Sequence, residues 1–223
     1  MISKELLERR KRIISRLKER GISSFEIPHL PYLHLDDSSF ATPHETGIRM
    51  IILYSCAIVA NNPGEREKVQ DWLVQENLWS QVSPKEKKLF EGEIADEELL
   101  NRFSWNIEAF YALAWALNIT PILYPPIREI EESEFEEVQS KMPKVGDSTS
   151  TFLAGLNYRD KSEIFEENIL NEIATTYFRD LMFNGEDDTT DINRLVSFER
   201  HVAFNWVRRF SDISDWDKTD TST

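Results

Sequence analysis

The sequence predicts a single all-α domain with a helical-bundle-like core. Apolar residues recur at helical spacing between strong start and stop signals, and no alternating β pattern of useful length interrupts them. The chain has 223 residues, of which 40% are hydrophobic. A chain of this length buries enough apolar surface to fold without disulfides or structural metals.

The first half of the chain divides into a basic helix, an irregular segment and a series of shorter helices. We expect the basic helix over residues 1–21, with Ser3 as its N-cap and Gly21 at its end. Three prolines make residues 22–45 an irregular segment. The helices expected after it are 48–61, which is apolar and buried, 65–76, and 83–91, which begins with Ser83, Pro84 and a capping box to Glu86.

A long helix over residues 97–118 is expected to form the centre of the bundle, because its second half is apolar on nearly every side. A short acidic helix over 129–139 follows, and residues 141–151 form a possible internal linker. The remaining expected elements are helices 162–183 and 191–209, the latter capped by Thr190 or Asp191, and a C-terminal tail over 210–223.

The net charge of −14 is distributed unevenly. Residues 1–20 carry a net charge of +5, so the rest of the chain carries −19. That field repels nucleic acid and favours a basic protein partner. The basic helix is interpreted as an amphipathic element whose cations complement the acidic body; an exposed face that binds nucleic acid or a membrane surface is the alternative.

The chain is expected to be cytoplasmic and to have no membrane span. It begins with charged residues, unlike a signal peptide, and its longest apolar run, 50–60, is much shorter than a membrane helix. The one cysteine, Cys56, lies within that run and is interpreted as a core residue.

Standard catalytic and cofactor motifs are missing. The seven glycines form no phosphate-binding loop, and no nucleophile elbow is present. The irregular segment contains His29, His34 and His44, but no cysteine or carboxylate completes a standard metal-ligand spacing around them. We therefore predict neither a cofactor nor a metal site.

Two groups of polar residues interrupt the predicted core. Glu108 lies in the apolar central helix, so its carboxylate requires a cation such as Arg49 or Arg200, and Glu199 lies beside Arg200. His201 and Asn205 are four residues apart and share another face of the last helix. The favoured interpretation is a structural polar cluster of Arg49, Glu108, Glu199 and Arg200. The alternative is an acid/base pocket formed by Glu108, His201 and Asn205.

The C-terminal tail combines one tryptophan with several carboxylates. We expect Trp216 to anchor the tail on the core, while Asp217 and Asp220 cap backbone groups or remain solvated. A divalent cation held by the two aspartates is the alternative, although two carboxylates alone make a weak site.

These blocks together resemble a bacterial family of uncharacterised proteins, domain of unknown function 4272. The resemblance rests on Arg49 at the start of an apolar helix, on the string WNIEAFYALAWAL (105–117), and on ERHVAFNW (199–206) with DWD (215–217) and DT (220–221). Where the family pattern has an arginine and a His-Trp pair before Arg179, this chain has NEIATTYF (171–178). The resemblance implies a domain of nearly the full chain length and no particular activity.

The leading functional hypothesis is a non-catalytic protein-interaction module, of an immunity or regulatory type, that binds a basic partner through its acidic surface. It rests on the charge of −19 outside the N-terminal helix and on the missing catalytic motifs. The alternative hypothesis is an enzyme, such as a hydrolase, that uses the Glu108, His201 and Asn205 pocket.

Overall fold

The computed structural model describes residues 4–23, 25–36, 38–94 and 96–221, and every regular element in these ranges is a helix. The all-α prediction is confirmed. The α-helices are α1 (Lys4–Lys18), α2 (Pro43–Asn61), α3 (Arg66–Gln75), α4 (Pro84–Phe90), α5 (Glu97–Ser104), α6 (Asn106–Ala116), α7 (Glu132–Gln139), α8 (Ser150–Ala154), α9 (Lys161–Asn184) and α10 (Arg194–Val207). Short 3-10 helices are η1 (Leu30–Leu33), η2 (Pro63–Glu65), η3 (Trp79–Gln81), η4 (Phe210–Asp212) and η5 (Trp216–Lys218).

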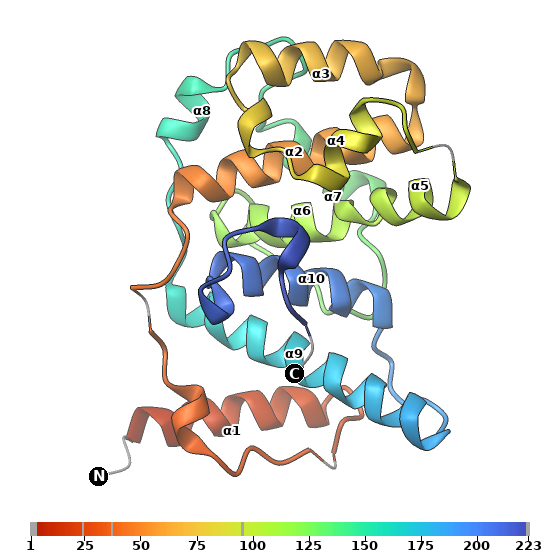
Figure 1. Cartoon of the computed structure of the whole chain (residues 1–223). Helices are drawn as coiled ribbons and strands as arrows, with labels where there is room; N and C mark the ends of the chain where they lie inside the picture. Colours follow the sequence, from red (N-terminus) through yellow and green to blue (C-terminus); the bar gives the residue numbers. More distant parts are fainter. Residues whose placement is uncertain (1–3, 24, 37, 95, 222–223) are drawn as a thin grey trace.

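The helices are stacked in layers, which Figure 1 shows from α3 at one edge to α1 at the other. Between these edges α2 packs on α6, α6 on α10, and α10 on α9. The residues of α6 from Ala109 to Ala116 are all buried, as expected for the centre of the bundle.

A single central helix over residues 97–118 was the wrong expectation, because Trp105 separates α5 from α6. The Ser104 hydroxyl donates a 2.6 Å hydrogen bond to the Asn101 carbonyl, a type of local bond that bends helices. The two helices differ in burial: α5 has no buried residue and packs on α2, whereas every residue of α6 except Ile107 is buried.

Two apolar clusters form the core, and they lie on opposite sides of the α9–α10 contact. The larger cluster joins α2, α6 and the apolar face of α10, and includes Met50, Phe110 and Phe204. The smaller cluster joins α1, the segment after it and the far face of α9, and includes Ile13 and Phe165. The α9–α10 contact between them is rich in polar side chains.

The inner cations of α1 are paired with α9. Arg12 contacts Glu166 at 2.5 Å, and Arg16 is bonded to Glu167. Arg9 is buried and donates to the Leu33 carbonyl at 2.8 Å and to Ser162 Oγ at 2.9 Å. Ser3, the expected N-cap, lies outside the described residues. These contacts support the interpretation of α1 as an amphipathic helix that complements an acidic body.

Two predicted boundaries were wrong because cap chemistry sets the helix starts. The irregular segment ends at Thr42 instead of residue 45: Pro43 is the first residue of α2, and Thr42 forms a capping box with Glu45. The last long helix is capped by Asn193, whose side-chain oxygen accepts from the amides of Leu195 and Val196, instead of by Thr190 or Asp191. The capping box of Ser83 and Glu86 on α4 is confirmed.

The possible linker over 141–151 contacts α3 closely. The Trp72 indole donates a 2.8 Å hydrogen bond to the Asp147 carbonyl. Thr149 is buried, and its amide and hydroxyl both donate to Glu76, at 2.7 and 2.8 Å. The segment therefore packs as an ordered connection between α7 and α8.

We predict that Gly47→Val lowers the free energy of unfolding by about 2–3 kcal/mol through overpacking. A Cβ atom at Gly47 would lie 2.2 Å from Leu156 Cδ1 and 2.8 Å from Leu153 Cδ2, where α2 meets α8. Urea denaturation measures the loss. Gly155→Val is the matched control, since a Cβ there meets atoms at ordinary distances of 3.6 Å or more; equal losses for the two variants would contradict the prediction.

Candidate functional site

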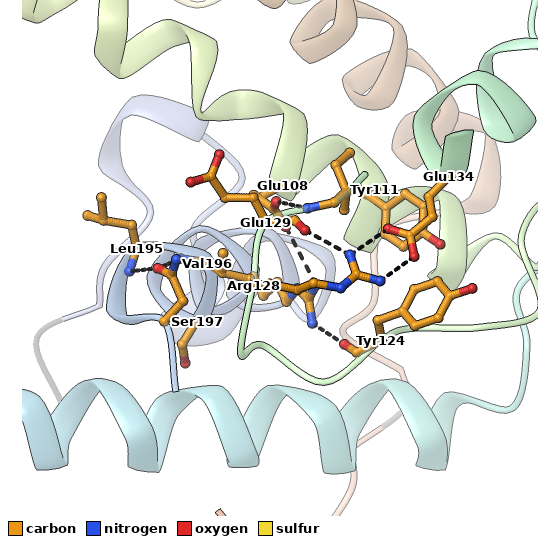
Figure 2. Close-up of polar contacts among 12 residues, drawn as sticks. Glu108, Tyr111, Tyr124, Arg128, Glu129, Glu134, Leu195, Val196 and Ser197 are labelled. Atoms are coloured by element: carbon orange, nitrogen blue, oxygen red, sulfur yellow. Dashed lines mark hydrogen bonds and ion pairs between the residues drawn. The ribbon is translucent and has the colours of Figure 1, made fainter. Parts of the chain in front are cut away.

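Glu108 and Arg200 form an ion pair in the centre of the bundle, with both side chains nearly inaccessible to solvent. The contact between Arg200 Nη2 and Glu108 Oε2 measures 3.5 Å. The other carboxylate oxygen accepts a 2.7 Å hydrogen bond from the Ile130 amide, and Arg200 Nη1 donates to the Tyr124 carbonyl at 2.6 Å. Figure 2 shows Glu108 close to Arg128, Glu129 and Glu134 of the segment that follows α6.

The ion pair holds this segment against α6 and α10. Burial raises the pKa of Glu108, although Arg200 and the Ile130 amide oppose the shift. Burial also lowers the pKa of Arg200. Both shifts have desolvation as their main cause, so the pair is costly to bury and depends on its additional backbone partners. At the surface Arg128 binds Glu134 in a bidentate contact and stacks on Tyr124 (Figure 2).

His201 and Asn205 face α9, where they belong to a different group of polar residues. Asn205 Nδ2 lies 2.9 Å from His201 Nε2, and His201 Nδ1 lies 3.2 Å from Thr175 Oγ1. The Asn205 side chain also accepts from Asn168 at 2.8 Å and donates to the Asp220 carbonyl at 2.7 Å. We call the buried members of this α9–α10 contact the polar layer: Asn168, Asn171, Thr175, Ser197, His201 and Asn205.

The hydrogen bonds of the polar layer require a neutral His201. The Thr175 hydroxyl donates to the Asn171 carbonyl at 2.8 Å, so the hydroxyl oxygen accepts a hydrogen bond from His201 Nδ1–H. Nε2 is then the acceptor for the Asn205 amide. Protonation of Nε2 would place two donors against each other. Burial lowers the pKa of His201 to about 3, and the nearby charges of Arg179 and Arg208 act in the same direction.

The structure does not join Glu108, His201 and Asn205 into one pocket. Glu108 contacts the segment after α6, whereas His201 and Asn205 contact α9 and the tail. Among the described residues, no hydrogen bond connects Glu108 to either of the other two. None of the three residues lines the cavity described below. The acid/base arrangement suggested by the sequence therefore lacks a common site.

Arg49 does not belong to the Glu108 group, which corrects the predicted structural cluster. Its guanidinium contacts Glu86 Oε1 at 2.6 Å and the Gln81 carbonyl at 2.6 Å, and Glu86 is itself buried. It also lies over the ring of Trp216, 5.2 Å from its centre. The reason is the position of Arg49 near the start of α2, which packs beside α4. Its guanidinium therefore reaches Glu86, the capping-box residue of α4, instead of Glu108.

The three predicted tail residues all contact the folded body. Trp216 packs edge-to-face on Trp206 at 6.0 Å, and Asp217 accepts from Ser83 Oγ at 2.9 Å and from the Lys85 amide at 3.0 Å. Asp220 contributes its backbone carbonyl to Asn205. In Figure 1 the tail crosses in front of α10. We call residues 210–221 the strap.

Glu199 lines a cavity instead of the ion-pair group. The cavity has a volume of about 460 Å³ and lies between α4, α5, α10 and the strap. Glu199 is half-buried, and burial raises its pKa to about 8. The sequence places Glu199 at the edge of an apolar stripe, but the cavity itself depends on the fold of α5 and the strap and has no sequence signal.

The described part of the chain offers neither a metal-binding cluster nor a helix that could span a membrane. It contains no group of three or more His, Cys, Asp and Glu side chains that could hold a metal ion. His29 and His34 flank η1, and His44 lies in the first turn of α2. In those same residues no helix is both long and apolar enough to cross a membrane.

An all-α domain with a buried Glu-Arg pair and a C-terminal strap matches one known family over nearly its whole length. Residues 9–219 match the family described as Domain of unknown function (DUF4272), and the chain belongs to that family. No curated protein and no solved structure matches the chain. The segment 171–178, which departs from the family pattern, supplies Asn171 and Thr175 to the polar layer.

We predict that Arg200→Met lowers the free energy of unfolding by about 3–5 kcal/mol, because it leaves Glu108 buried without its cation. The double variant Glu108→Gln/Arg200→Met should lose less, since no charge remains. Lys68→Met is the control: it removes a pair with Glu65 in which both side chains are exposed, and should cost at most about 1 kcal/mol. A similar loss for Arg200→Met and Lys68→Met in chemical denaturation would contradict the assignment.

We predict that His201 makes the protein less stable as the pH falls. In the unfolded chain His201 takes up a proton near pH 6.5, whereas in the folded chain it does so only near pH 3. Stability is therefore lost progressively below about pH 6.5, by up to about 1.4 kcal/mol per pH unit from this group. Denaturation of the wild type and of His201→Gln across this range measures the slope, and equal slopes would contradict the prediction.

Proposed function

We propose that the protein is a non-catalytic protein-binding module, with a regulatory or immunity-type role, that engages a basic partner through its acidic surface. The observation that supports this proposal best is an exposed apolar patch bordered by carboxylates where α9 ends and α10 begins. The alternative, an enzyme with an acid/base pocket, named Glu108, His201 and Asn205, and these side chains contact different parts of the fold.

The apolar centre of this surface is unusually exposed. Phe183 is 91% exposed, Met182 66% and Leu195 50%. Arg194, the residue before Leu195, places its guanidinium 3.9 Å from the Met182 sulfur. This contact brings the start of α10 close to the end of α9. A large aromatic side chain in solvent stabilises nothing in the isolated chain, so such patches mark interaction surfaces. We call Met182, Phe183 and Leu195 the apolar patch.

The surroundings of the apolar patch are acidic. The turn after α9 carries Glu186, Asp187, Asp188 and Asp191, all exposed. Further exposed carboxylates lie before and within α5 and around α7. An apolar centre with a charged rim is the usual arrangement of a protein interface.

The basic helix does not cancel this acidic field, because it is already used inside the molecule. Arg9, Arg12 and Arg16 are directed at α9, where Glu166 and Glu167 bind them. Within the described residues, no ion pair joins a cation to Glu186, Asp187 or Asp188, although Arg20 interacts electrostatically with Asp191. A partner with lysine or arginine around an apolar anchor would complement this end of α9 in both charge and hydrophobicity.

The test is affinity capture from a lysate of the source cells at about 50 mM and about 500 mM salt. We expect a partner that is retained at low salt and released at high salt. Phe183→Ser should abolish capture, since removing a central aromatic anchor commonly costs more than about 2 kcal/mol. Asp187→Asn/Asp188→Asn should weaken it.

The control for this experiment is Val74→Ser on α3, which removes an apolar side chain that is also 50% exposed but lies on another layer of the molecule. Its capture should equal that of the wild type. Capture that is insensitive to salt, or that is lost equally in Val74→Ser and Phe183→Ser, would contradict the proposal.

A further inference from the structure

The cavity beside Glu199 has the size and lining of a small-molecule site. Its volume of about 460 Å³ falls within the range of about 300–1,000 Å³ that ligand pockets usually have. Four elements enclose it: α4, α5, α10 and the strap. Its apolar wall consists of Ile94, Leu99, Phe103, Phe198, Val202 and Trp216.

The polar side of the cavity is cationic, in contrast to the acidic molecule as a whole. Lys85, Lys88 and Arg102 line it and are exposed, and no ion pair involves any of them within the described ranges. The two other acidic residues of the lining are already engaged: Glu86 binds Arg49, and Asp217 accepts from Ser83 and the Lys85 amide. Asp217 keeps its negative charge, because both of its donors are neutral, but the three cations of the cavity outnumber it.

Glu199 does not supply another anion. No described residue is hydrogen-bonded to its carboxyl group, which lines the cavity. Burial raises the pKa of Glu199 to about 8, Glu108 adds to the shift, and Arg102 opposes it. At neutral pH the carboxyl group thus keeps its proton in most molecules and presents a hydrogen-bond donor to the cavity.

We propose that this cavity binds a small organic carboxylate with an apolar body. The carboxylate accepts from Arg102 and from the protonated Glu199, while the apolar body packs on Phe103, Phe198 and Trp216. Lys85 and Lys88 add attraction for an anion at the opening.

A carboxylate fits this lining better than a phosphate. Phosphate sites in proteins usually draw on several backbone amides at a helix N-terminus. Here the Lys85 amide of α4 is bonded to Asp217, and the Leu99 amide of α5 is bonded to Asp96, so these amides are occupied. The remaining donors come from a few side chains, which suits a ligand group with two oxygens.

Calorimetric titration of the full chain with four eight-carbon probes tests the proposal: octanoate, octyl phosphate, octylammonium and octanol. Octanoate should bind, and at neutral pH it should bind at least about tenfold more tightly than octylammonium or octanol. Tighter binding of octyl phosphate than of octanoate would overturn the carboxylate assignment. No octanoate binding at millimolar concentration, or equal binding of octanoate and octylammonium, would overturn the site.

Two variants test the named contacts. Arg102→Gln should weaken octanoate binding about tenfold or more, and because Arg102 is exposed, the melting temperature should change little. Lys11→Gln, on the distant α1, should change neither. An unchanged affinity in Arg102→Gln would overturn the proposal.

The pH dependence distinguishes the role of Glu199 from simple attraction to cations. Above about pH 8 the Glu199 carboxyl ionises and repels a bound carboxylate, so the affinity of the wild type should fall. The other charged groups that line the cavity are Lys85, Lys88, Arg102, Glu86 and Asp217. Glu199→Gln keeps a neutral donor and should bind octanoate within about twofold of wild type near pH 6.5, without the decline at higher pH. Identical pH profiles would overturn the proposed contact.

Discussion

α10 buries polar groups on two of its faces, and the surrounding fold supplies hydrogen-bond partners for most of their polar atoms. Arg200 faces α6 and the Tyr124–Ile130 segment, while His201 and Asn205 face α9. A buried polar group without a partner costs about 1–3 kcal/mol, and a buried charge costs more. If α10 were rotated by one residue, Arg200 would turn away from Glu108, and His201 and Asn205 would turn away from α9. Both sets of contacts would then be broken. The helix therefore has one favourable register, and α6, α9 and the strap are positioned by it.

Local chemistry explains which parts of the fold the sequence predicted. The all-α class, the buried α6 and the capping box at Ser83 follow from residue spacing within a few turns. The break at Trp105 was not predictable, because it reflects the different environments of α5 and α6. The partner of Arg49 is likewise determined by the packing of α4 beside α2. For Glu108, the sequence predicted the need for a cation, and long-range packing selected Arg200.

The candidate site was predictable only in part for the same reason. Buried polar residues such as Glu108 and His201 are conspicuous in an apolar pattern, but the pattern does not show which face of a neighbouring helix receives them. Glu199 illustrates this limit, since it lies next to Arg200 in the chain and yet lines a separate cavity. The result is a molecule with two electrostatically different surfaces: an acidic rim around Phe183, and a local cationic opening near Arg102. Long-range attraction therefore favours cationic macromolecules, while short-range contacts in the cavity favour small anions.

The separation of the two apolar clusters by the polar layer has a consequence for how the molecule opens. The smaller cluster, formed by α1, apolar residues that follow it and one face of α9, shares no residue with the larger one, and hydrogen bonds of the polar layer link α9 to α10 between them. We expect such a unit to exchange its amide hydrogens through a partial unfolding event of lower free energy than global unfolding. We therefore expect the fold to unfold in two parts. The N-terminal layer unfolds locally while the α2–α6–α10 core remains native.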